Sequence, residues 1–232
     1  MTDVTSCLSI TVNDYVLTPI PVGSAAGSSF ARMFLRQIAF EHDGGSGLSV
    51  NFNDPCPTQT IATLPPYPTA LHLLRRYIAQ VHIWWPILHL PDLRRNLEAV
   101  YRDPGNSTDS QKFVVFAMLA LASAESQGDQ DYRRLMDLNE PASYFRTCVR
   151  FTEPLYNHPQ HLFKVQGFLL IGLWMLDSKV SRDCNDVWQL SRYIMSAAIE
   201  GGLHRQYASW HFSTDEQETR TRTWWCSYNL ER

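Results

Sequence analysis

The chain has 232 residues, 44% of them hydrophobic, which is enough to build one sizeable core. Its formal net charge of -3 excludes an overall positive field that would draw the chain onto nucleic acid or anionic lipid. The cysteines, Cys7, Cys56, Cys148, Cys184 and Cys226, are too far apart for a disulfide framework or a structural zinc site. The spacing therefore predicts that the thiols are reduced, as in a protein of the nucleus or cytosol.

Residues 1–63 form the first predicted unit, an extension or linker. Glycine gathers at residues 44–47 and a stretch punctuated by proline runs from Pro55 to Pro68, a composition that favours turns and poor order. Within this unit, residues 29–38 carry an apolar stripe at helical spacing and predict one short helix that docks on the later core. Residues 48–52 alternate between apolar and polar side chains and hint at a short extended piece.

The helical pattern begins at Thr69. Five apolar residues step by three and four and place one stripe along a first helix: Leu71, Leu74, Ile78, Val81 and Trp85. Pro86 is expected to end this helix. Pro91 suits the first turn of a second helix that continues over residues 92–101.

Two later segments are apolar around most of their circumference. Residues 113–122 follow several candidate N-caps at 107–110, and residues 161–176 follow a break at His158-Pro159. Their longest apolar runs, 113–122 and 168–176, are each about half of the ~20 residues that span a hydrocarbon core, so both segments predict buried helices in the middle of a bundle. A further helix is expected between them, over residues 140–156.

The last two predicted helices have clear end signals. Residues 187–199 carry an apolar stripe that stops at Gly201-Gly202, where a left-handed C-cap is easily formed. Ser213 and Glu216 have the spacing of a capping box, which starts the final helix. Two ion pairs of the favourable order are expected on that helix, Glu216 with Arg220 and Glu218 with Arg222. The fold class that follows is all-α, an irregular multi-helix bundle with a poorly ordered N-terminal extension.

Several sequence stretches occur in the order typical of one known family. They read YIAQVHIWWPILH at residues 77–89, VQGFLL at 165–170, AAIEGGLHR at 197–205 and RTRTWWCSYNLER at 220–232. In this order they resemble the fungal-specific transcription factor domain, the middle homology region of fungal zinc-cluster regulators. The resemblance makes residues 64–232 one domain of this type, expected to be incomplete at its C-terminus.

The resemblance implies a regulatory and interaction domain in the nucleus that modulates transcription by RNA polymerase II and catalyses no reaction. No C-x2-C-x6-C array precedes it, so zinc and promoter DNA are expected only in a missing N-terminal module. Glu231 stands where the family usually has Asp. The partners implied are a small-molecule effector and a protein partner or a second copy of the chain, with no membrane.

Catalytic, cofactor-binding and metal-binding residues are not predicted. His158 and His161 are three apart, but no further ligand at helical spacing completes a metal set. Asp129, Asp131 and Asp137 are the acidic cluster that an all-helical prenyl-diphosphate enzyme would use for Mg²⁺, and their spacing does not match that enzyme's aspartate motif. Such an enzyme remains one alternative. A stand-alone adaptor or fragment without DNA-binding capacity is the other.

The remaining chemistry-bearing residues are interpreted as structural. His82 and His89 flank a turn and are expected to be packing residues. His204 lies at the predicted end of the 187–199 helix, where a charged histidine would interact favourably with the negative end of the helix dipole. Cys148 and Cys226 read as small core residues. The helical tryptophans are interpreted as core packing, with a ligand pocket as the alternative: Trp84, Trp85, Trp174, Trp188, Trp224 and Trp225.

Overall fold

The computed structural model describes residues 62–124, 140–157, 160–177, 184–205 and 211–232, together with four two-residue strands near the N-terminus. Strand β1 (Cys7–Leu8) pairs antiparallel with β4 (Ile20–Pro21), and β2 (Thr11–Val12) pairs antiparallel with β3 (Tyr15–Val16). The sequence patterns did not predict these strands. The predicted helix over 29–38, the predicted extended piece over 48–52 and the acidic cluster at 129–137 lie outside the described residues.

The first predicted helix is two elements in the structure. Helix α2 (Tyr67–Arg76) continues directly into a π-helix, η1 (Tyr77–His82). A π-turn contains more residues than an α-turn, so it rotates the side chains that follow it. In η1, Tyr77 is fully buried and Ile78 of the predicted stripe is only half-buried. In α2, before the π-turn, Leu73 is fully buried and Leu71 is half-buried.

Helix α3 (Leu90–Arg102) has a proline in its first turn, as predicted from Pro91. It is amphipathic and buries Leu93, Leu97 and Val100 on one face. Helix α4 (Asp109–Ala124) follows, and every residue from Phe113 to Ala124 is buried. The prediction that this segment lies in the middle of the bundle is confirmed.

The single helix predicted over residues 140–156 is wrong, because the structure divides it into α6 (Pro141–Val149) and α7 (Glu153–Asn157). Pro154 has no backbone N–H, so it cannot donate the helical hydrogen bond to the carbonyl of Arg150. Proline also disfavours helical backbone at the residue before it. Helix α7 restarts with this proline in its first turn, where the missing donor costs nothing.

Three long helices complete the chain: α8 (His161–Asp177), α9 (Cys184–Glu200) and α10 (Thr214–Glu231). Helix α9 ends where predicted, and Gly202 has a φ of 65°, a conformation that suits glycine. Ser213 caps α10 as predicted, since its side chain accepts a hydrogen bond from the amide of Glu216 at 3.2 Å.

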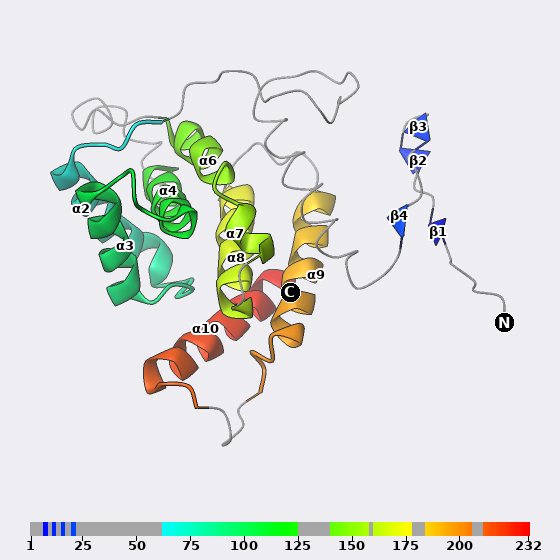
Figure 1. The fold of residues 1–232 in the computed structure, drawn as a ribbon. Helices are drawn as coiled ribbons and strands as arrows, with labels where there is room; N and C mark the ends of the chain where they lie inside the picture. Colours follow the sequence, from blue (N-terminus) through cyan, green and yellow to red (C-terminus); the bar gives the residue numbers. More distant parts are fainter. Residues whose placement is uncertain are drawn as a thin grey trace.

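Helices α4 and α8 pack against each other in the middle of the bundle (Figure 1). Helix α4 also contacts α2, η1, α3, α6 and α7, whereas α8 contacts α7, α9 and α10. The packing is tight at Gly167, where an added Cβ would lie 2.2 Å from a methyl carbon of Leu155. The predicted all-α bundle with two apolar central helices is therefore confirmed. The domain boundary between residues 63 and 64 stays a prediction.

Candidate functional site

The segment between η1 and α3, residues 83–89, is called the connector here. Its start is fixed because the amides of Trp84 and Trp85 donate to the carbonyl of Val81 at 3.1 and 2.9 Å. Its middle is fixed because the carbonyl of Ile87 accepts from Nε2 of Gln166 at 2.7 Å, with Oγ1 of Thr223 at 3.4 Å. Side chains from α8 and α10 thus hold the connector against the core.

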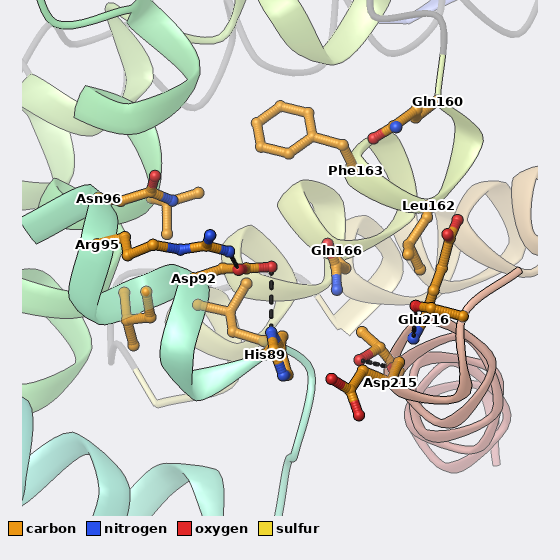
Figure 2. Close-up of a pocket in the computed structure, with 15 residues that line it drawn as sticks. His89, Asp92, Arg95, Asn96, Gln160, Leu162, Phe163, Gln166, Asp215 and Glu216 are labelled. Carbon is orange, nitrogen blue, oxygen red and sulfur yellow. Dashed lines mark hydrogen bonds and ion pairs between the residues drawn. The ribbon is translucent and has the colours of Figure 1, made fainter.

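A pocket of about 440 Å³ opens beside the end of the connector. It lies where the N-terminal ends of α3, α8 and α10 meet, and Figure 2 shows these walls around a central Gln166. Its apolar lining includes Leu88, Leu162 and Phe163. The volume lies in the range of about 300–1,000 Å³ that small-molecule sites occupy.

The α3 wall of the pocket is a charged network. Nδ1 of His89 lies 3.1 Å from one carboxylate oxygen of Asp92, and Arg95 donates to the other. Partial burial raises the pKa of Asp92, but the hydrogen bonds and charges of Arg95 and His89 outweigh it and hold the pKa below its usual value. This carboxylate is therefore ionised at neutral pH and is already neutralised by its neighbours.

The α10 wall presents acceptor groups. Asp215 and Glu216 belong to the first turn of α10, where carboxylates interact favourably with the helix dipole. The predicted pair of Glu218 with Arg222 is present at 3.4 Å. Arg220, expected to pair with Glu216, donates to the carbonyl of Gly201 at 2.8 Å and interacts with the charge of Glu216. Asp215 and Glu216 both line the pocket (Figure 2).

The arrangement suits a small polar ligand better than it suits a metal ion. Within the described ranges, no group of three histidine, cysteine, aspartate or glutamate residues is placed to hold a metal. Gln166 and the carboxylates of Asp215 and Glu216 offer acceptors, while Arg95 and Asn96 offer donors. A few convergent polar groups on an apolar lining are the usual composition of a ligand pocket.

Two further histidines, His161 and His204, are described by the structure and do not line the pocket. His161 is exposed at the start of α8, and His158 falls outside the described residues. His82 is buried as predicted. His204 accepts a hydrogen bond from Arg205 at 2.8 Å and lies 5.4 Å from the ring of Trp224, so it packs beside α10 after the end of α9.

A buried polar cluster joins η1 to α10. The ring of Tyr77 lies 6.1 Å from that of His82, and burial followed by the nearby Arg222 lowers the pKa of His82. Burial, followed by the charge of Cys226, raises the pKa of Tyr77, and burial raises the pKa of Cys226 to about 11. These shifts keep Tyr77 and Cys226 neutral, as the core interpretation of Cys226 predicts. Cys148 is likewise buried, and burial raises the pKa of its thiol.

The packing interpretation of the tryptophans is only partly right. Trp174 is buried and its ring stacks on Phe145 at 4.8 Å. Trp84, Trp188 and Trp225 are instead exposed on the surface. Helical spacing determines which residues share a face of a helix. It does not show whether another helix covers that face, so the exposure of these tryptophans could not be predicted from the sequence.

Curated relatives match most of the chain at low identity. Two relatives are transcriptional regulatory proteins of Schizosaccharomyces pombe that are named as uncharacterized. The first is 24% identical over an alignment that covers 72% of this chain and 27% of the relative. The second is 23% identical over an alignment that covers 75% of this chain and 22% of the relative. The pyrimidine pathway regulatory protein 1 of Saccharomyces cerevisiae is 23% identical over 41% of this chain and 10% of its own length. The chain thus spans about a quarter or less of the relatives it matches.

No solved structure matches the chain. Among the described helices, none is both long enough and apolar enough to cross a membrane. The model of the fungal specific transcription factor domain matches residues 74–232, which include η1, the connector, both central helices and α10. Over this range the sequence resemblance, the helical fold and the regulatory relatives agree, and the chain belongs to the fungal specific transcription factor domain family.

Proposed function

We propose that this chain is the effector-responsive regulatory domain of a fungal transcription factor, acting in the nucleus on transcription by RNA polymerase II without catalysing a reaction. Membership of the family and the regulatory names of the relatives support this role. In this proposal, promoter DNA and zinc belong to a separate module of the regulator. The domain changes how strongly the bound regulator acts.

The observation that carries the effector is the pocket of about 440 Å³ between α3, α8 and α10. Its acceptors, among them Asp215, Glu216 and Gln166, favour a small molecule with hydrogen-bond donors such as an amine. Phe163 and Leu162 offer apolar contact to the body of the same molecule. The pocket borders three helices and the connector, so a ligand bound there would bias how these elements pack.

The test fuses the chain to an unrelated DNA-binding module and measures a reporter gene while a library of small amines and other polar metabolites is supplied. Asn96→Phe places a ring into the pocket from α3, and Glu98→Phe places the same ring on α3 outside the pocket lining. We expect a subset of compounds to change the reporter signal in the unmodified fusion and in the Glu98→Phe fusion. The Asn96→Phe fusion should no longer respond.

Two results would contradict the proposal. The first is a response that survives Asn96→Phe unchanged, because it would place the effector elsewhere. The second is a reporter signal that stays the same when the whole domain is removed, because the domain would then regulate nothing. Circular dichroism of the purified variants verifies that each keeps its helical content.

A further inference from the structure

An apolar groove lies at the C-terminal end of α8, away from the pocket. It has a volume of about 320 Å³. Helix α8 contributes Leu173 and Leu176, α4 contributes Leu121, and the end of η1 with the connector contributes Val81, Trp84 and Trp85. Gln80 completes the lining, so no lining residue carries a formal charge. We name these seven residues the tryptophan groove.

The apolar rim of the tryptophan groove is unusually exposed. Trp84 is 77% exposed, the neighbouring Ile83 68% and Leu176 55%. Contiguous exposed apolar surface of this kind marks interaction sites in soluble domains. The backbone of Trp84 is also held in place, since its amide and that of Trp85 both donate to the carbonyl of Val81. A fixed backbone reduces the conformational entropy that is lost when the aromatic side chain binds a partner.

The groove has an electrostatic preference despite its uncharged lining. Helices η1, α4 and α8 all end beside it, at His82, Ala124 and Asp177. Helix C-termini carry partial negative charge, and the last turns of α4 and α8 contain no basic residue to offset it. This preference favours a partner that brings lysine or arginine beside its apolar residues.

The small size of the surface selects the kind of partner. Stable interfaces between folded proteins involve about 20–30 residues on each side. The tryptophan groove and Ile83 together make eight residues, fewer than such an interface uses, which favours a small partner over a second copy of this chain. A single helix that lays a few apolar anchors into a groove needs much less area.

We propose that the tryptophan groove docks one amphipathic helix of a partner protein, a helix with an apolar stripe flanked by lysine or arginine. The stripe covers Trp84, Leu173 and Leu176. The basic side chains lie next to the carbonyl ends of α4 and α8. This surface differs from the effector pocket, so the domain has one site for a small molecule and another for a protein helix.

The test uses the whole chain and two short synthetic helical peptides with the same leucine stripe, one with lysine and one with glutamate at the other positions. Binding is measured by fluorescence anisotropy of the labelled peptides. We expect the lysine peptide to bind at least about tenfold more tightly than the glutamate peptide, because it faces three helix C-termini. Trp84→Ala should weaken the lysine peptide by at least about tenfold.

Trp188→Ala is the matched control, since Trp188 is 54% exposed on α9 and does not line the groove. It should bind the lysine peptide as tightly as the unmodified chain. Leu176→Lys is a second variant, which puts a cation into the groove from an exposed position and should also weaken binding of the lysine peptide by at least about tenfold. Equal circular dichroism spectra verify that all three variants are folded.

Three results would overturn the proposal. One is tight binding of the lysine peptide to Trp84→Ala, which would place the peptide elsewhere. Another is equal binding of the lysine and glutamate peptides, which would remove the electrostatic preference. The third is a dimer, seen by analytical ultracentrifugation, that Trp84→Ala abolishes, because a second copy of the chain would then occupy the groove.

Discussion

The two ends of helix α8 differ in chemistry although they belong to one buried element. Its N-terminal end brings Phe163 and Gln166 to a polar pocket, and its C-terminal end brings Leu173 and Leu176 to an apolar groove. The stretch that joins the two ends is the core of the helix, since every residue from 165 to 175 is buried. Gln166 and Leu176 are about 15 Å apart along the helix axis at 1.5 Å per residue. One central helix therefore supports the fold and two opposite kinds of surface.

The difference follows from the direction of the helices. Three helix N-termini surround the pocket, and carboxylates lie among them, as the helix dipole favours. Three helix C-termini surround the groove, and the last turns of α4 and α8 contribute no basic residue there. The connector links the two, because Trp84 and Trp85 line the groove while Leu88 and His89 line the pocket.

The largest expected effect is a difference in the free energy of unfolding between substitutions in the buried middle of α8 and at its exposed end. Leu170→Ala should lower the free energy of unfolding by about 2–5 kcal/mol, because Leu170 is 1% exposed and its loss leaves a cavity. Leu176→Ala makes the same chemical change on the same helix at an exposed position and should cost less than about 0.5 kcal/mol. Urea unfolding followed by circular dichroism measures both. Equal losses would show that the middle of α8 is not the core.

A smaller effect is expected where α8 holds the connector. Gln166→Leu removes the 2.7 Å hydrogen bond to the carbonyl of Ile87 and should cost about 1–3 kcal/mol of unfolding free energy. The comparison is Thr223→Val, which removes the longer 3.4 Å contact to the same carbonyl and the bond of Thr223 to Thr219. It should cost less than Gln166→Leu in the same urea experiment. The reverse order would mean that α10, not α8, holds the connector.

The smallest expected effect is a pH dependence at η1. Burial and Arg222 lower the pKa of folded His82, whereas the unfolded chain keeps the ordinary value of about 6.5. As the pH decreases through about 6.5, His82 takes up a proton in the unfolded chain but stays neutral in the folded chain. The contribution of neutral His82 to the free energy of unfolding is therefore fully present above about pH 6.5 and decreases below it. The slope for one proton is at most about 1.4 kcal/mol per pH unit.

Unfolding free energies measured from pH 7.5 to 5 should therefore decrease less steeply for His82→Gln than for the unmodified chain. Both proteins contain the same other histidines, so the difference between the two curves isolates His82. Identical curves would mean that His82 is as accessible to protons in the folded chain as in the unfolded one.

The sequence was sufficient for features that depend on local chemistry. Apolar residues all around 113–122 and 161–176 predicted the two central helices, and residues 113–124 and 165–175 are buried in the structure. Ser213 predicted the start of α10, and Gly202 predicted the end of α9. Each of these signals lies within one turn of the element that it specifies, so no tertiary information is needed to interpret it.

Features that depend on neighbouring helices could not be predicted. The π-helix at 77–82 changes which side chains face the core, and the interpretation of all six helical tryptophans as packing missed the exposure of Trp84, Trp188 and Trp225. The pocket and the groove each combine side chains from segments far apart in the chain. Only the break at Pro154 had a local signal, the proline itself.

Amide hydrogen exchange tests most directly that α4 and α8 form one core that carries both surfaces. We predict that the backbone amides of residues 113–124 and 165–175 exchange slowest in the chain, with the same opening free energy. Leu170→Ala should lower that free energy by the same amount in both helices. Loss of protection in α8 alone, with α4 unchanged, would contradict the single core and with it the shared support of the pocket and the groove.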